Sequence, residues 1–173
     1  GGKGDFALIG HGTIMKKNET SAITALLDAL SDTPLHYACE YGHSDVVRLL
    51  LEHGANMSLS DDNDWTPLDR ACEQGFPNIV RLLLDHGAEV NDWDEGGRTP
   101  LHVACLYGRS DVVRLLLEKG ADVNTKSMTG WSALDYTLDL PPDEPSREEI
   151  MDLFRQYAPE AVMEAYCTQS PQS

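Results

Sequence analysis

Histidine and cysteine side chains recur three residues apart in this chain, and such pairs could serve as metal ligands. His36 lies three residues before Cys39, and His102 lies three residues before Cys105. Residues three apart on a helix share a face, so each pair could supply two ligands. A closed zinc site needs four convergent ligands, however, and both pairs recur at one place in a repeated pattern, which favours packing. We therefore expect no metal site.

A second candidate for chemistry lies near the start of the chain. The segment Gly10-His11-Gly12-Thr13 is similar to a fragment of a glycine-rich phosphate loop. It lacks the Lys-Ser/Thr ending and a strand-to-helix setting, so we expect a flexible segment instead. No Ser-His-Asp or Cys-His arrangement stands out beyond the positions that recur along the chain. We predict that the protein is not an enzyme and that it uses no cofactor.

The dominant pattern is a repeat with a period of 33 residues. Segments that begin at Thr33, Thr66, Thr99 and Ser132 read TPLH, TPLD, TPLH and SALD. Apolar blocks with the pattern VVRLLL or IVRLLL follow at the same interval. They begin at Val46, Ile79 and Val112. This many coincidences at one interval indicate repeated structural units.

Each unit predicts two short helices. Thr33 has the hydroxyl of a helix N-cap and Pro34 has the fixed φ of a first helical residue, so a helix is expected to begin there. Gly42 can close that helix in a left-handed conformation. Ser44 is then expected to cap a second helix that runs to about His53.

The rest of the unit predicts a turn and a reason to stack. Polar residues 58–64 are typical of a hairpin-like turn. The apolar residues of the second helix cover more than one face, so a lone unit would leave apolar surface in water, at roughly 25 cal/mol per Å². Neighbouring units that stack on one another would bury that surface.

These residues resemble a known family: TPLHxACxxGHxxVVRLLLxxGA at period 33 is similar to the ankyrin repeat, over residues 32 to about 157. The resemblance implies an all-α solenoid of stacked helix-turn-helix units, with hairpin loops along one edge and a concave face. In the family, the histidine of the motif ties neighbouring loops together. Asp69 and Asp135 replace it here, so we expect looser junctions at those units.

The repeat divides the chain into six segments. They are an irregular N-terminal segment (1–31), three repeats (32–65, 66–98 and 99–131), a degenerate C-terminal capping repeat with an insertion (132–158), and a short helical turn with a disordered tail (159–173). Within the capping repeat, Ser146 and Glu149 predict a capping box.

The N-terminal segment contains four apolar residues at helical spacing, which predict an amphipathic helix that could cover the first repeat. They are Ile23, Leu26, Leu27 and Leu30. Leu27 is six residues before Thr33, whereas Leu50 is sixteen residues before Thr66, so about ten residues of hairpin are missing. A directly abutting cap, an engineered deletion or a foreign fused segment would each explain the short junction.

Composition excludes several partner classes. The chain has 29 acidic and 13 basic residues, a net charge of −16 and a sequence pI near 4.5, which oppose binding to nucleic acid and anionic membranes. Its apolar runs are a few residues long, far short of the roughly 20 that span a bilayer. Cys39, Cys72 and Cys105 recur at the repeat interval, which favours packing over disulfides and an intracellular compartment, cytoplasm or nucleus. We expect a monomer.

Positions that vary between equivalent units predict where a partner binds, since scaffold positions agree. By the resemblance, these variable positions line the concave face and combine carboxylates with aromatic rings. They are Glu40, Tyr41, Asp62, Asn63, Trp65, Glu73, Gln74, Trp93, Asp94, Glu95, Arg98, Leu106, Tyr107, Met128 and Trp131. Exposed Trp and Tyr are enriched at binding hot spots, and carboxylates attract Lys and Arg.

This surface predicts a non-catalytic adaptor or scaffold that binds a basic or extended segment of another protein. A W-T-P-L junction beside acidic hairpins is similar to ankyrin domains that read unmodified histone tails, so a histone tail is one candidate. Acidic hairpins can also serve only to keep the protein soluble. Trp65 and Trp131 are as compatible with structural roles as with binding. Trp93 is the better candidate for contact with a partner. A steric inhibitor of an enzyme and a substrate-recruiting unit of a larger ubiquitin ligase or kinase are the alternatives.

Overall fold

The chain folds as a row of helix pairs, described here from a computed structural model. The structure describes the backbone of residues 6–9 and 13–16, and both backbone and side chains of residues 33–163. The four pairs are α2 (Pro34–Glu40) with α3 (Ser44–Glu52), α4 (Pro67–Gln74) with α5 (Pro77–Asp85), α6 (Pro100–Leu106) with α7 (Ser110–Glu118), and α8 (Ala133–Asp139) with α9 (Pro145–Tyr157). A helical turn at 159–163 follows α9.

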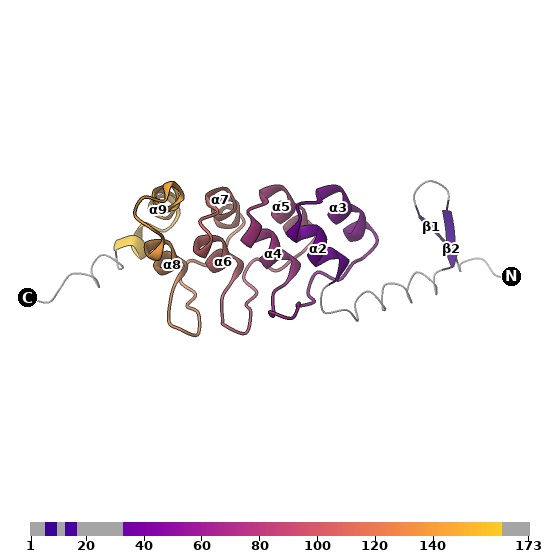
Figure 1. Cartoon of the computed structure of the whole chain (residues 1–173), viewed down its shortest axis with the longest axis horizontal. Helices are drawn as coiled ribbons and strands as arrows, with labels where there is room; N and C mark the ends of the chain where they lie inside the picture. The colour runs from indigo at the N-terminus through magenta and orange to yellow at the C-terminus, as the bar shows by residue number, and fades with distance from the viewer. Residues whose placement is uncertain (1–5, 10–12, 17–32, 164–173) are drawn as a thin grey trace, which may run out of the picture.

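The helices form two rows. The hairpins that connect each helix pair to the next all project on the same side of the stack (Figure 1). The first helices α2, α4, α6 and α8 form the row nearest these hairpins, and α3, α5, α7 and α9 form the other row. Within each pair the two helices contact one another, and each also contacts its counterpart in the next pair. The predicted all-α repeat solenoid is therefore confirmed.

A short two-stranded hairpin precedes the helices, and the sequence analysis did not predict it. Strands β1 (Phe6–Ile9) and β2 (Thr13–Lys16) pair antiparallel, with Phe6 opposite Lys16. Thr13, the last residue of the segment with a phosphate-loop likeness, is the first residue of β2. Residues 10–12, the predicted helix over residues 23–30 and the predicted tail beyond residue 163 lie outside the described residues.

Capping residues fix where the first helix of each pair begins. The Thr33 hydroxyl accepts a hydrogen bond from the His36 N–H, and Pro34 is the first helical residue, as predicted. Gly42 ends this helix with φ of +78°, a conformation that most side chains avoid. A Cβ at Gly42 would also lie 2.8 Å from Cζ of Phe76 in the next unit, so glycine permits both the turn and the close stacking.

Two predicted helix starts are wrong in detail. Ser44 is the first residue of α3, and His43 occupies the N-cap position without a side-chain hydrogen bond. The predicted capping box of α9 is also wrong, because the helix begins at Pro145 and Glu149 instead accepts a hydrogen bond from the Ser110 hydroxyl (2.6 Å). Proline is favourable at a first helical position, and it sets the start ahead of the capping-box pattern.

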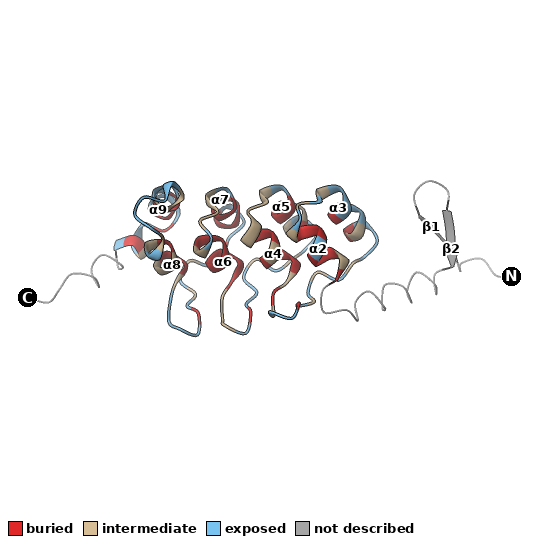
Figure 2. Cartoon of the chain, viewed as in Figure 1, coloured by how far each residue is buried: buried red, intermediate tan, exposed pale blue. Residues whose placement is uncertain are grey.

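A continuous core runs along the stack between the two rows of helices, where buried positions face one another (Figure 2). Cys39, Cys72 and Cys105 are fully buried free thiols in this core, as expected for packing positions. Burial raises the pKa of Cys39 and of Cys105 to about 12, so these thiols stay protonated at neutral pH. No helix within the described residues is long and apolar enough to cross a membrane.

Candidate functional site

His36 connects the first unit to the hairpin that follows it. Its Nε2 donates a hydrogen bond to the backbone oxygen of Trp65 (3.0 Å), and its Nδ1 accepts one from the Thr33 hydroxyl (2.9 Å). His102 is likewise buried, with Nδ1 accepting a hydrogen bond from the Thr99 N–H (3.0 Å). His36 therefore links two units, whereas the hydrogen bonds of His102 lie within its own helix cap. Across residues 33–163, no group of three metal-ligating side chains is close enough to hold an ion.

Asp69 takes the equivalent position in the second unit and acts only locally. Its Oδ2 accepts hydrogen bonds from the Thr66 N–H (2.9 Å) and hydroxyl (2.7 Å), which close a capping box. Its Oδ1 is buried and has no hydrogen-bond partner in the described part of the chain. Burial raises the pKa of this carboxyl to about 6. Asp69 therefore caps its own helix, whereas His36 bonds to the hairpin that follows it. The looser junction expected at the second unit remains a prediction.

Trp65 lies at the centre of the junction between the first two hairpins. Only 6% of the residue is exposed, and its Nε1 donates a hydrogen bond to Asp94 Oδ2 (3.2 Å). The guanidinium carbons of Arg70 and Arg98 lie 5.0 and 5.6 Å from the centroid of the indole ring. The ring of Tyr107 packs edge-on against the indole, with the two ring centroids 6.3 Å apart. Of the two roles left open for Trp65, the structure favours the structural one.

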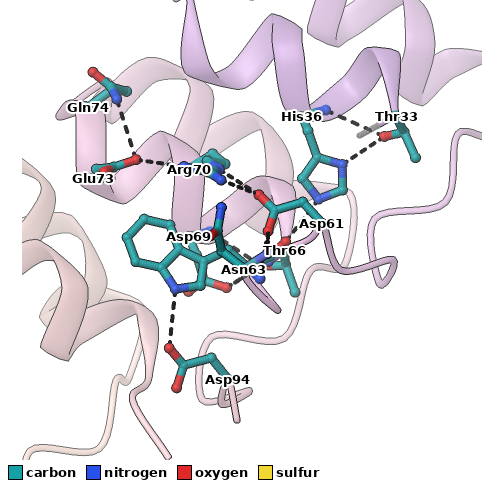
Figure 3. Close-up of polar contacts among 11 residues, drawn as sticks. Thr33, His36, Asp61, Asn63, Thr66, Asp69, Arg70, Glu73, Gln74 and Asp94 are labelled. Atoms are coloured by element: carbon teal, nitrogen blue, oxygen red, sulfur yellow. Dashed lines mark hydrogen bonds and ion pairs between the residues drawn. The ribbon is translucent and has the colours of Figure 1, made fainter. Parts of the chain in front are cut away.

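Two buried aspartates hold the arginines beside this indole. Figure 3 shows the first pair, Asp61 with Arg70, and the hydrogen bond from the indole to Asp94. Asp61 accepts hydrogen bonds from the Asn63 and Trp65 N–H groups and from Arg70 Nε (2.6 Å). Burial alone would raise the pKa of Asp61, but these donors outweigh it and the pKa is lowered.

Asp94 forms the same arrangement one unit further along the stack. Its carboxylate accepts hydrogen bonds from Arg98 N (2.8 Å) and Arg98 Nε (2.9 Å), and its side chain is 2% exposed. Asp94 was expected to attract a basic partner. The structure corrects that expectation, because the buried carboxylate is already occupied by Arg98 and the indole N–H of Trp65.

A shallow pocket of about 390 Å³ opens above the buried indole. Its lining residues come from the first hairpin, α4, the second hairpin and the end of α6. They are Asn63, Asp64, Trp65, Arg70, Glu73, Arg98 and Tyr107. Asp64 and Arg70 were not among the predicted site residues. The recurrence of Asp61 and Asp94 at the repeat interval, each with an arginine four or nine residues later, is the signal that could have predicted the buried ion pairs.

The surroundings of the pocket are acidic when the buried Asp61 and Asp94 are counted, although its own lining balances two carboxylates against two arginines. Both guanidinium groups are already paired, Arg70 with Asp61 and Glu73, and Arg98 with Asp94. Asp64 and Glu73 line the pocket beside the two arginines, and the buried carboxylates of Asp61 and Asp94 lie behind that lining. Burial and the neighbouring Glu73 carboxylate raise the pKa of Tyr107, so its hydroxyl remains a hydrogen-bond donor at neutral pH.

The other predicted site residues lie on the first helices and hairpins, outside the pocket. Glu40, Gln74 and Leu106 are half-buried, and Tyr41, Asp62, Trp93, Glu95, Met128 and Trp131 are exposed. Tyr37 was missed: its ring stacks on that of Tyr41 at 6.4 Å, and the four-residue spacing of the two tyrosines on one helix was the available signal. We use the name hairpin face for the pocket residues together with the predicted residues outside the pocket, which are Glu40, Tyr41, Asp62, Gln74, Trp93, Glu95, Leu106, Met128 and Trp131.

Comparisons with known proteins agree with this architecture. The family model described as ankyrin repeats (3 copies) matches residues 8–94 and 61–127. A segment of 52 residues is 42% identical to the "Ankyrin repeat and KH domain-containing protein CBG24701" of Caenorhabditis briggsae, and 41% identical to "Ankyrin repeat and KH domain-containing protein mask-1" of Caenorhabditis elegans. Each match covers 30% of this chain and 2% of the relative.

Proposed function

Because the chain belongs to the ankyrin-repeat family, whose repeats are protein–protein interaction modules, we propose that it binds a basic, extended segment of another protein along the hairpin face. The module is non-catalytic in this proposal. The observation that supports it is the pocket above Trp65, whose lining includes the carboxylates of Asp64 and Glu73, so that it can receive one cationic side chain.

The charge of the units supports a cationic partner at one end of the stack. Residues 33–65 contain six acidic residues and one basic residue, and residues 66–98 contain seven acidic and three basic residues. Residues 99–131 contain three acidic and four basic residues. A basic segment would therefore be attracted mainly to the first two units, where the pocket lies.

Exposed aromatic rings on the first helices and the second hairpin suit the same partner. Tyr41 is 61% exposed and Tyr107 40% exposed on the first helices, and Trp93 is 71% exposed on the second hairpin. Such rings bind the aliphatic stems of Lys and Arg and attract their charged ends. The lysine-rich tail of a histone is the specific partner that we propose to test, since it combines charge with an extended conformation.

A binding titration tests the proposal directly. The probe is a fluorescent twelve-residue peptide of alternating Lys and Ala, compared with a peptide of alternating Gln and Ala, at about 50 and 200 mM NaCl. We expect the Lys peptide to bind more tightly and to weaken with salt. Replacing the pocket carboxylates (Asp64→Asn with Glu73→Gln) should weaken it about 10-fold, the effect of about 1.4 kcal/mol.

A matched control removes two exposed carboxylates elsewhere. Asp45→Asn with Glu52→Gln makes the same charge change on α3, in the other row of helices. The control should change affinity less than twofold. Equal weakening by both double variants would mean that only net charge matters, and equal binding of the Lys and Gln peptides would reject a basic partner. A synthetic unmodified histone-tail peptide in the same titration tests the specific partner.

A further inference from the structure

The three hairpins close with the same backbone turn, and the first departs from the others at one position. In each turn, the N–H of this position donates a hydrogen bond to the carbonyl oxygen three residues earlier. The position is held by Asp64, Gly97 and Gly130, with donor–acceptor distances of 2.9, 2.8 and 2.8 Å. All three are left-handed, with φ of +58°, +68° and +84°. Asp64 is the one residue other than glycine with a positive φ in the part of the chain that the structure describes.

Glycine suits this position because a Cβ is unfavourable in a left-handed backbone conformation. Hairpin loops of this type accordingly have glycine where the left-handed residue falls. Aspartate tolerates the conformation better than most residues do, but with a cost in stability relative to glycine. The turn itself therefore does not account for the aspartate in the first hairpin.

The Asp64 side chain also differs from the other charged groups of the pocket lining, because it has no partner. Arg70 and Glu73 pair with one another (3.2 Å), and Arg98 pairs with a buried aspartate (2.7 Å). Asp64 is half-buried, and its carboxylate forms no hydrogen bond or ion pair with any residue of 33–163. Both of its oxygens are therefore open to a ligand.

We propose that Asp64 is the residue of the pocket that pairs with the cationic side chain of the partner. This inference rests on the proposed function and assigns its charge recognition to one residue. A carboxylate with two open oxygens gains more from an incoming cation than one already shared with an arginine. Recognition of the partner then explains an aspartate where the other two hairpins have glycine, and stability and binding are opposed at this position.

Two substitutions of Asp64 separate the conformation of the backbone from the charge. Asp64→Gly removes both the strain and the carboxylate, whereas Asp64→Asn removes the charge but keeps a residue that tolerates a left-handed φ. Asp64→Gly should raise the thermal midpoint by about 1–3 °C, and Asp64→Asn should change it by less than about 1 °C. Each should weaken binding of the Lys-Ala peptide about 5-fold.

Two matched variants test the same effects elsewhere. Gly130→Asp makes the reverse substitution in the third hairpin, where an added Cβ would have no heavy atom within 4 Å. It should lower the thermal midpoint by about 1–3 °C. Glu73→Gln removes one charge from the same pocket lining, and it should weaken peptide binding only about 2-fold, because Arg70 already shares that carboxylate.

The outcomes distinguish this inference from the proposed function. A lower midpoint for Asp64→Gly, or a loss of affinity on Glu73→Gln as large as that on Asp64→Asn, would overturn the inference. If the parent and Asp64→Asn bind the Lys-Ala peptide equally well, and both prefer it to the Gln-Ala peptide, the proposed function stands and the role of Asp64 is rejected. A parent protein that binds both peptides equally would reject both.

Discussion

Trp65 and Trp131 occupy the same place in their units, yet one is buried and the other is not. Trp65 is 6% exposed because Arg70 of α4 and Arg98 of the next hairpin lie beside its ring. Trp131 is 38% exposed and meets Tyr136 at 5.1 Å, with no further hairpin beyond it in residues 132–163. In a stack, the following unit decides whether a tryptophan is structural or available to a partner.

The neighbours Asp94 and Glu95 show the same division within one hairpin. Asp94 is buried between Trp65 and Arg98, whereas Glu95 is exposed to solvent. Adjacent carboxylates of one hairpin can therefore serve the fold and the partner separately. Substitutions within the pair Trp65 and Trp131, and within the pair Asp94 and Glu95, can therefore separate effects on stability from effects on binding.

The largest expected effect is on Trp65. Trp65→Ala should lower the free energy of unfolding by about 3–5 kcal/mol, since it empties a buried site and leaves Asp94 and the two arginines without the ring. Trp131→Ala should lower it by about 1 kcal/mol or less, because the residue is partly exposed. Urea denaturation followed by circular dichroism measures both. Equal losses would contradict a structural role specific to the first junction.

The next largest effect is on the aspartate of the second hairpin. Asp94→Ala should cost about 2–3 kcal/mol, because it leaves the indole N–H and the Arg98 guanidinium without their acceptor. Glu95→Ala should change stability by less than about 0.5 kcal/mol. The same denaturation experiment compares them. A destabilised Glu95 variant would show that the exposed carboxylate also supports the fold.

Asp69 should make stability depend on pH. Its pKa is about 6 in the folded chain and near 4 in the unfolded chain, so the folded state binds more protons between these values and loses stability as pH rises through them. We expect a loss on the order of 2 kcal/mol between about pH 4 and pH 7, relative to Asp69→Asn. Denaturation midpoints across that range measure the difference. Parallel pH profiles for the two proteins would rule out the ionisation of Asp69 as the cause.

Asp69→His restores the residue type found at His36 and His102. We expect it to raise the unfolding free energy by about 1 kcal/mol, through a new hydrogen bond from the imidazole to the next hairpin, as His36 makes to Trp65. Denaturation at pH 7.5 is the measurement. A less stable protein would mean that the local capping box contributes more than the missing link.

The last effect is on binding and separates it from folding at the exposed aromatic residues. Trp93→Ala should weaken binding of the Lys-Ala peptide by about 1–2 kcal/mol, roughly 5- to 30-fold, with a thermal midpoint within about 2 °C of the parent. Titration and thermal denaturation of the same sample give both numbers. A lowered midpoint with unchanged affinity would assign Trp93 to the fold.

The sequence predicted the units well because the determinants of each helix are local. Thr33 with Pro34 specifies a helix start, and Gly42 specifies its end, wherever the unit lies. The start of α9 was missed because Pro145 competes with a capping-box pattern that is also local. Strands β1 and β2 were missed although Phe6–Ile9 is a short apolar run followed in the sequence by two glycines, Gly10 and Gly12, a recognised hairpin signal.

The site was harder to predict because its residues are defined by contacts between units. The sequence identified Trp65, Glu73 and Tyr107 as surface candidates, and the structure brings them to one pocket. It did not show that Asp94 is used internally, because that depends on where Arg98 of the same hairpin places its guanidinium group. The period of 33 residues fixes which positions are equivalent, but not which neighbours surround them.

The central claim is that the pocket above Trp65 receives a cationic side chain. A titration of isotope-labelled protein with the Lys-Ala peptide, followed by the ¹H–¹⁵N signals of the three indoles and the backbone, tests it most directly. We predict that the Trp65 indole and the Asn63 and Tyr107 amides shift most, and that Asp64→Asn with Glu73→Gln abolishes these shifts. Largest shifts on α3, α5 and α7, or shifts that persist in the variant, would contradict the account.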